Sequence, residues 1–241
     1  MSARRGLSEH EIIQALLDAY RRGYFPMAEQ IFHGPGGSRI HWFSPDPRGI
    51  VPLSADEGFH VPRRLESRLR ASPFTLRLNT AFEAVMRGCA RRRAKDDPGD
   101  LHDHTWIDET IVTWYLLLHR AGHAHSLEAW ANDDAGRPAL VGGIYGVAIG
   151  AAFFGESMFH APRPRLPTGA RHPLDGTDAS KICLVTLVRA LHDAGFVLFD
   201  TQMLTAHVRR FGGLEIPRRD YLRRLDAALA IPDRWPSLRI T

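Results

Sequence analysis

Residues 139–156 read ALVGGIYGVAIGAAFFGE, and the first seventeen of these residues carry no charge. The uncharged run contains five glycines and is shorter than the roughly 18 to 20 residues that a helix needs to span a bilayer. Two buried strands joined by a tight turn fit this composition better, and we place them at 139–145 and 147–154. Glu156 therefore follows directly on a buried strand.

The segments on both sides of this run mix helices with strands. Thr80 and Glu83 have the spacing of a capping box, which predicts that a helix starts at Thr80. Residues 160–178 contain four prolines and few apolar side chains, which predicts an exposed loop. Further helices are expected at 80–93, in the segment closed by Gly122 and at 179–194, and further strands at 73–78, 125–131 and 196–201. Adjacent strands in the middle of the chain, with helices around them, predict an α+β fold.

The N-terminal part differs from the rest in composition. Ser8 and Glu11 again form a capping-box pattern, and apolar residues then repeat on one helical face until Gly23. The following residues, up to Leu53, are rich in glycine, proline and aromatic residues, which is typical of short strands and turns. We therefore expect a small N-terminal domain over 1–57 and a larger domain over 58–241.

Composition excludes several classes of protein. The chain has 241 residues, 44% of them hydrophobic, and a formal net charge of +4, which argues against a disordered or fibrous protein. Of its 31 basic residues only Lys95 and Lys181 are lysines. Clusters of arginine suit an RNA phosphate backbone, but they also suit solvated faces paired with the 27 acids, and composition leaves both interpretations open.

The chain shows no signal for secretion or for a membrane. Its N-terminus is charged and lacks an apolar core, so we expect a cytoplasmic protein without a secretion signal. Cys89 and Cys183 lie far apart in apolar patterns and are expected to be reduced thiols. Neither cysteine has the local sequence of a nucleophile. The histidine pairs His102/His104 and His123/His125 lack an obvious third ligand, and no metal is expected.

Three polar residues stand where apolar ones are expected. Glu156 ends one core strand, and Asp200 and Gln202 end another, with a spacing that places both on one face of a strand. A carboxylate and an amide at the ends of two core strands can converge on one pocket. The alternative is that these residues cap helices or pair with arginines.

Nine local strings, in the same order, resemble those of the leucyl/phenylalanyl-tRNA–protein transferases, bacterial enzymes that append Leu or Phe from aminoacyl-tRNA to protein N-termini. The strings are Gly23-Tyr-Phe-Pro26, Trp42-Phe-Ser-Pro-Asp-Pro-Arg48, Thr105-Trp-Ile107, Gly122-His-Ala-His-Ser126, Leu140-Val-Gly-Gly-Ile-Tyr-Gly146, Gly155-Glu-Ser-Met-Phe159, Ala179-Ser-Lys181, Asp200-Thr-Gln202 and Glu215-Ile-Pro-Arg-Arg-Asp-Tyr221.

This resemblance implies a small N-terminal α/β domain and a larger C-terminal domain of acetyltransferase-like (GNAT-related) fold. It also implies that Glu156, Asp200 and Gln202 match the family's catalytic residues. In the family, the amide at the Gln202 position contacts the acceptor's α-amino group and is held by the Asp200 position. The Glu156 position helps to bind the substrate amine.

The resemblance also implies a binding site for the donor. Trp106, Tyr115 and Trp42 match positions around the 3′ end of aminoacyl-tRNA. The apolar pocket for the transferred side chain is matched by Ile144, Phe153, Met158, Leu187, Leu191 and Phe199. The chain departs from the family in two places: Met27 stands where tryptophan is frequent, and the segment between Phe159 and Ala179 is longer.

The implied reaction moves Leu or Phe, and in some cases Met, to an N-terminal Arg or Lys, and marks the acceptor for degradation. An aminoacyl-tRNA ester is already activated, so no cofactor is expected, and orientation of the two reactants supplies most of the rate. We expect a monomer with no membrane partner. Two other functions stay open: an acyl-CoA N-acyltransferase, for which Arg209-Arg-Phe-Gly-Gly-Leu214 is an incomplete pyrophosphate loop, and a non-catalytic RNA-binding module.

Overall fold

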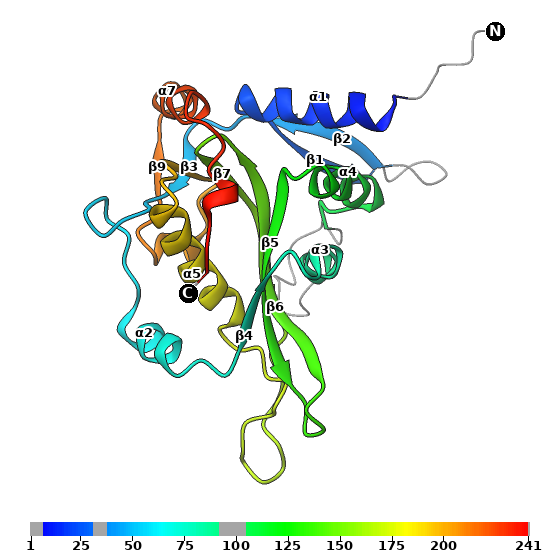
Figure 1. Ribbon diagram of the computed structural model, residues 1–241, viewed down its shortest axis with the longest axis vertical. Coiled ribbons are helices and arrows are strands. Elements are labelled where there is room, and N and C mark those ends of the chain that lie inside the picture. Colours follow the sequence, from blue (N-terminus) through cyan, green and yellow to red (C-terminus); the bar gives the residue numbers. More distant parts are fainter. Residues whose placement is uncertain (1–6, 31–37, 92–104, 241) are drawn as a thin grey trace, which may run out of the picture.

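The computed structural model describes residues 7–30, 38–91 and 105–240 (Figure 1). Helices alternate irregularly with strands, so the expected α+β class is confirmed. The helices are α1 (Glu9–Arg21), α2 (Arg63–Arg70), α3 (Phe82–Ala90), α4 (Glu109–Arg120), α5 (Ala179–Asp193), α6 (Ala206–Arg209) and α7 (Arg218–Leu229), followed by a 3-10 turn (Trp235–Ser237). The strands are β1 (Phe25–Gln30), β2 (Ser38–Phe43), β3 (Arg48–Val51), β4 (Thr75–Leu78), β5 (Ala124–Asn132), β6 (Pro138–Ile149), β7 (Ala152–His160), β8 (Leu198–Gln202) and β9 (Leu214–Ile216).

Seven strands form the central sheet, in the order β4-β5-β6-β7-β8-β3-β9. All neighbours are antiparallel except β7 and β8, which run parallel. The chain between these two strands passes through α5, as a parallel pair requires a crossover. Strands β1 and β2 form a separate antiparallel hairpin.

Helices cover both faces of the sheet (Figure 1). Helix α5 packs on one face, where its buried residues join a core that includes Leu127, Ile144 and Phe153. Helices α3 and α4 lie on the other face, and α1 and α7 extend this second core at the end of the sheet. The alternating residues of the strands supply both cores, which explains why β6 is apolar on both of its faces.

The uncharged stretch forms two neighbouring strands, as expected, but the predicted turn is misplaced. The turn lies at Gly150, whose φ of +60° suits glycine. Gly146, where the break was predicted, lies inside β6. A Cβ atom on Gly146 would approach the carbonyl oxygen of Phe154 to 2.2 Å, so this glycine permits close pairing of β6 with β7.

Other local predictions need correction. Helix α3 has Ala81 as its N-cap, and Thr80 makes no cap, because its hydroxyl and its backbone N–H both bind the buried carboxylate of Glu128. The strand predicted at 196–201 begins at Leu198. The loop at 160–178 is exposed over 162–165 and 167–171, but Asp175 and Gly176 are buried within it.

The small N-terminal unit is tied to the larger one. Helix α1 and the β1–β2 hairpin come first, but β3, which lies before the predicted boundary at residue 57, pairs with β8 and β9 in the central sheet. His102 and His104, one of the two histidine pairs considered above, lie outside the described residues. In the part of the chain that the structure describes, no helix has the length and apolarity to cross a bilayer.

Candidate active site

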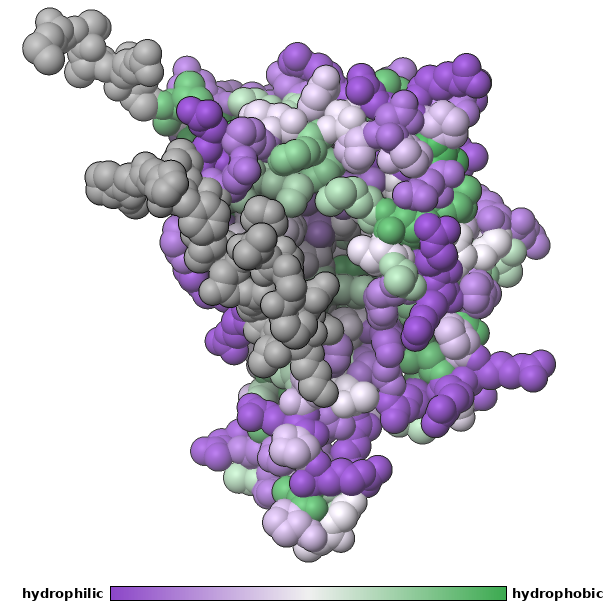
Figure 2. All heavy atoms as spheres, turned by 180° about the vertical axis from the view of Figure 1, so that it is seen from behind, coloured by the Kyte–Doolittle hydropathy of each residue, from purple (hydrophilic) through white to green (hydrophobic). Residues whose placement is uncertain are grey.

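Strands β7 and β8 diverge at the point where the predicted polar residues begin. Their parallel pairing joins Ala152 to Leu198 and ends with Phe154 opposite Asp200. Beyond that point, residues of both strands line a cavity of about 330 Å³. Seen from the side opposite to Figure 1, the surface is hollowed near its centre, with apolar residues beside the hollow (Figure 2).

Glu156 reaches the cavity from an irregularity in β7. Gly155 pairs with Gly146, but the next pair along the strand joins Ser157 to Tyr145, so Glu156 has no residue opposite it on β6. An extra residue of this kind bends the strand and re-aims its side chain. Glu156 thus lines the cavity and does not continue the alternation of the sheet.

Two polar groups donate hydrogen bonds to the Glu156 carboxylate, and a third contacts one of them. Its Oε1 atom accepts hydrogen bonds from the Tyr20 hydroxyl (2.7 Å) and from Gln202 Nε2 (3.2 Å). The Tyr20 hydroxyl also meets the buried hydroxyl of Tyr115. Because the hydrogen of Tyr20 points at Glu156, Tyr115 donates to the Tyr20 oxygen. Helices α1 and α4 therefore hold a carboxylate that belongs to β7.

This environment changes the acidity of Glu156. Burial raises the pKa of Glu156 to about 7, although the hydrogen bond from Tyr20 and the nearby Tyr115 hydroxyl act in the opposite direction and Asp200 adds a smaller increase. A carboxyl group with this pKa exchanges a proton near neutral pH. Perturbed groups of this kind gather at functional sites.

Gln202 is held in an unusual backbone conformation. Its φ is +56°, in the left-handed region that residues other than glycine rarely adopt. The backbone N–H of Gln202 donates to Asp200 Oδ1 at 2.8 Å, which fixes this conformation. Because Gln202 Nε2 faces the acceptor oxygen of Glu156, its carbonyl oxygen is the atom left to accept a hydrogen bond from a ligand.

Asp200 lies behind the cavity and is fully buried. Arg48, also fully buried, binds it through two parallel bonds, Nε to Oδ1 (2.9 Å) and Nη2 to Oδ2 (2.6 Å). Tyr221 donates to the same Oδ2 at 2.8 Å. Pairing with an arginine was the alternative left open by the sequence, and the structure shows it for Asp200. Asp200 therefore holds the backbone of Gln202 and does not itself line the cavity.

Arg48 connects four parts of the molecule. Besides Asp200, its Nη1 atom donates to the carbonyl of Gly23 at 2.8 Å. The guanidinium lies between the rings of Phe25 and Tyr221, 5.1 and 4.4 Å from their centroids. A planar cation suits such stacked, bidentate surroundings, whereas lysine does not.

The cavity has a largely apolar wall. Of the six residues expected around the transferred side chain, Ile144, Met158 and Phe199 line the cavity, and Phe153, Leu187 and Leu191 pack in the core behind it. The lining also includes Leu184 of α5, which we did not predict. Phe153 meets Phe199 edge to face at 5.2 Å, so it supports the wall without touching the space.

The three residues expected at the 3′ end of the donor lie in different places. Trp106 lines the cavity. Tyr115 is buried in the hydroxyl network behind Glu156. Trp42 lies on the surface, 41% exposed, with its ring stacked on Trp114, and it is not among the described residues that line the cavity.

Tyr20, Arg48, Tyr221 and Leu184 were absent from the residues proposed from sequence. Arg48 and Tyr221 stand at the ends of two of the nine quoted strings, which was a signal for them. Tyr20 has the helical spacing of an ordinary core residue, and nothing in its local sequence indicates that its hydroxyl reaches Glu156.

The other candidate chemistries find no support in the described residues. His125 is stacked on Trp235 at 3.8 Å, and no group of three potential metal ligands occurs within 7–30, 38–91 and 105–240. Burial raises the pKa of Cys183, which disfavours a nucleophilic thiolate. The string from Arg209 to Leu214 leads into strand β9, so it opens no helix that could receive a pyrophosphate.

Comparison with known proteins identifies the family. The model of the family described as leucyl/phenylalanyl-tRNA protein transferase matches residues 53–226, and that of its N-terminal domain matches residues 13–46. The chain belongs to this family. Its expected resemblance to the leucyl/phenylalanyl-tRNA–protein transferases is thereby confirmed.

Individual relatives match most of the chain. A leucyl/phenylalanyl-tRNA–protein transferase of Nitrobacter winogradskyi is 44% identical over 216 residues, which cover 90% of this chain and 82% of the relative. Those of Rhodopseudomonas palustris and Phenylobacterium zucineum are 43% and 45% identical, over 95% and 90% of this chain and 86% and 84% of their own lengths.

The two matched segments of this leucyl/phenylalanyl-tRNA–protein transferase family member both contribute to the site. Tyr20 lies in the N-terminal segment, and Glu156, Asp200 and Gln202 lie in the larger one. Arg48 lies between the two segments and contacts both. The site is therefore built where the small N-terminal unit packs against the sheet.

Proposed function

We propose that this chain transfers a leucyl or phenylalanyl group from tRNA to the N-terminal amine of an acceptor protein. The observation that carries this proposal is an apolar cavity whose polar end is formed by Glu156 and Gln202. The apolar wall suits an aliphatic or aromatic side chain, and the polar end suits amine groups. Membership of the family supports the same reaction.

The reaction joins an amine to an activated ester. The amine nitrogen forms a bond to the ester carbonyl carbon, and the bond from that carbon to the ribose oxygen of the tRNA breaks. The amine loses a proton and the ribose oxygen gains one. The free carbonyl oxygen of Gln202 accepts a hydrogen bond from the attacking amine, and the ionised Glu156 holds an amino group of the substrate. Asp200 and Arg48 keep Gln202 in place.

The acceptor is a protein that begins with Arg or Lys. The positive side chain of such a residue adds to the charge of the α-amino group and is attracted to the acidic end of the cavity. Such a product feeds the degradation of proteins by their N-terminal residue. Trp106 holds the terminal adenosine, since aromatic side chains stack on bases. We also propose that the protein acts as a monomer. The use of aminoacyl-tRNA supports a cytoplasmic location.

Transfer assays test this proposal directly. Labelled Leu, Phe and Met on their tRNAs are offered to peptides that begin with Arg, Lys, Asp or Ala, and product is measured by mass. We expect transfer of Leu and Phe to the Arg and Lys peptides, and little to the others. A folded protein that transfers neither amino acid to any of them contradicts the proposal.

We expect the size of the cavity to determine whether Leu or Phe is transferred more readily. Leu184→Phe adds volume to the wall beside Ile144 and Met158, so transfer of Phe is expected to fall more than transfer of Leu. Filling a tight pocket shifts such a ratio by about 10-fold to 200-fold. Competition between the two labelled donors measures it. Leu184→Met, which conserves volume, is the control, and its ratio of Leu to Phe transfer should stay within a few fold of that of the unaltered protein. If Leu184→Phe leaves this ratio unchanged, the transferred side chain does not bind in this cavity.

The rate of transfer is expected to rise with pH with a midpoint near 7, because Glu156 has a pKa of about 7 and acts as the carboxylate. Tyr20→Phe removes a hydrogen bond that lowers this pKa, so its midpoint moves upward. Tyr24→Phe, at an exposed position, is the control. The measurement is the pH profile of single-turnover transfer, and a Tyr20→Phe midpoint equal to that of the unaltered protein contradicts the assignment.

A further inference from the structure

The segment from Ala161 to Asp178, which we call the arginine loop, joins β7 to α5 and lies outside the site described above. Figure 1 shows it projecting beyond the end of the sheet, next to the β5–β6 turn. Its eighteen residues contain neither helix nor strand. Loops longer than about 12 to 15 residues without secondary structure are uncommon in compact domains, and are either functional or disordered.

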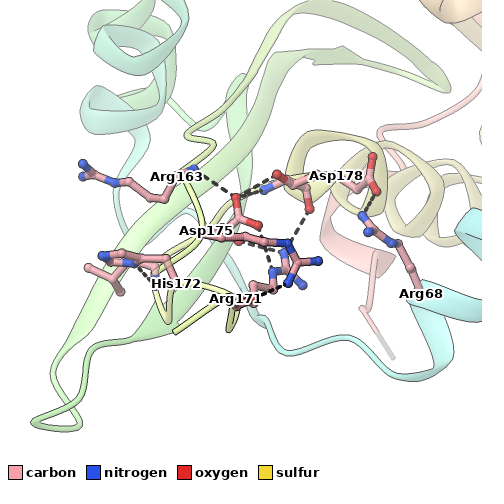
Figure 3. A network of polar contacts seen from close by, with 10 residues as sticks. Arg68, Arg163, Arg171, His172, Asp175 and Asp178 are labelled. Atoms are coloured by element: carbon pink, nitrogen blue, oxygen red, sulfur yellow. Dashed lines mark hydrogen bonds and ion pairs between the residues drawn. The ribbon is translucent and has the colours of Figure 1, made fainter. Parts of the chain in front are cut away.

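The arginine loop is ordered by one buried carboxylate. Asp175 accepts hydrogen bonds from the backbone N–H of Arg163 (3.0 Å) and of Thr177 (3.1 Å), from the Thr177 hydroxyl (2.7 Å) and from Arg171 Nε (2.9 Å), as drawn in Figure 3. Burial alone would raise the pKa of Asp175, but these bonds outweigh it and lower the pKa to about 2. The N–H of Gly176 binds the carbonyl of Ala161 at 2.9 Å and closes the base of the loop.

The second acid of the loop is neutralised as well. Asp178, next to the start of α5, binds Arg68 of α2 and Lys181 of α5. Arg171 is committed to Asp175 and to the carbonyl groups of Asp175 and Thr177. Each acid of the loop is therefore paired with a cation, and neither is left to offset further positive charge.

Two arginines of the loop remain exposed without an acidic partner. Arg163 and Arg165 stand in the run Pro162-Arg-Pro-Arg-Leu166, and neither forms an ion pair with any described residue. The Arg163 guanidinium points away from the Asp175 network (Figure 3). Among the described residues, the Arg165 side chain donates to the carbonyl of Gly169 alone. Prolines fix φ on both sides of Arg163, so less backbone entropy is lost when this part of the loop binds a ligand.

The loop begins close to the candidate active site. His160, the last residue of β7, is four residues from Glu156, which is about 13 Å along an extended strand. A nucleic acid whose terminal ester lies at Glu156 and Gln202 reaches the loop within a few nucleotides if it leaves the cavity along β7. An acceptor that begins with Arg or Lys carries the same charge as Arg163 and Arg165, so the loop favours RNA.

We propose that the arginine loop binds the phosphate backbone of the donor tRNA near its 3′ end, through the guanidinium groups of Arg163 and Arg165. This inference rests on the proposed function. Arginine presents a planar fork that matches phosphate oxygens, and such contacts position the RNA without reading its sequence.

The test compares the full chain with Arg163→Gln/Arg165→Gln in binding to uncharged tRNA at several salt concentrations. Each phosphate contact contributes about 0.7 to 0.9 to the slope of log Kd against log salt, so the double variant is expected to lose about 1.4 to 1.8 of that slope. Its affinity near 0.1 M salt is expected to fall roughly tenfold or more. Arg120→Gln/Arg223→Gln removes two exposed arginines of α4 and α7 that are paired with Glu9 and Asp220, and it should retain the slope of the unaltered protein.

Two further measurements separate this inference from the proposed function. A trinucleotide with the sequence CCA binds only in the cavity, so its affinity should be equal in the double variant and the unaltered protein. If the unaltered protein binds tRNA and transfers Leu while the double variant keeps the same salt slope, the loop inference alone is wrong. A raised KM for the acceptor peptide with unchanged tRNA affinity also overturns it. If the unaltered protein neither binds tRNA nor transfers Leu, the proposed function fails first.

Discussion

Replacing Glu156 with glutamine is expected to lower the rate of transfer by about 10²-fold to 10³-fold, the range found when one preorganised electrostatic contact is removed. Glutamine keeps the shape of Glu156 and can still accept the hydrogen bond from Tyr20. It has no negative charge to hold the substrate amine. Single-turnover transfer of Leu to an Arg peptide measures this loss.

The same substitution is expected to stabilise the protein at alkaline pH. The pKa of Glu156 rises from 4.5 to about 7 on folding, so the ionised carboxylate opposes folding above pH 7. Its protonated form imposes no such cost below pH 4.5, and the cost grows as the pH rises between these values. The shift corresponds to at most about 3 kcal/mol.

Denaturation at pH 5 and pH 8 measures that effect, with Glu109→Gln, at an exposed acid, as the control. If the Glu156→Gln variant transfers Leu slowly but is more stable at pH 8, Glu156 has a direct role in the reaction. If the variant is slow because it is unfolded, or if it transfers Leu at the rate of the unaltered protein, the role given to Glu156 is contradicted.

Replacing Arg48 with methionine is expected to lower the free energy of unfolding by about 3 to 5 kcal/mol, because the substitution leaves Asp200 charged, buried and without its ion-pair partner. It also leaves the carbonyl of Gly23 without the donor it has in the intact protein. Urea denaturation followed by fluorescence measures the change. A stability within 1 kcal/mol of the unaltered protein would mean that the pair contributes no more than a surface contact does.

A double variant separates stability from positioning. Arg48→Met/Asp200→Leu removes both charges, and apolar replacements of buried ion pairs are often close to neutral in stability. We expect much of the stability to return. The rate of transfer should be lower than that of the unaltered protein, because the backbone N–H of Gln202 loses the acceptor that fixes its left-handed conformation. Full recovery of the rate in the double variant contradicts a positioning role for Asp200.

Much of the site was visible in the sequence because polar residues interrupted an apolar pattern. Glu156 directly follows an uncharged run, and Gln202 ends a short apolar strand, so both could be selected without knowing the fold. The same reasoning placed Asp200 at the pocket, where the structure instead puts it behind Gln202 and pairs it with Arg48. A strand end identifies the edge of a sheet, but not which of two nearby side chains faces the open space.

Pocket residues were predicted less well than polar ones. Phe153, Leu187 and Leu191 share the apolar character of Ile144 and Met158, and all five are part of or packed against the same core. Which of them borders the cavity depends on where β7 and β8 stop pairing. That pairing ends at Phe154, two residues before the extra residue at Glu156, and an alternating pattern of apolar residues reveals neither the break nor the bulge.

The sequence by itself determined the α+β class, the two central strands, most helices, the family and the polar ends of the core strands. These depend on periodicity, capping patterns and local strings, which act over a few residues. Only the tertiary structure decided which partners meet. Tyr20 reaches Glu156 across 136 residues and Arg48 reaches Asp200 across 152. Such pairs form because strand pairing and helix packing bring distant segments together and exclude water between them, and no local pattern encodes that choice.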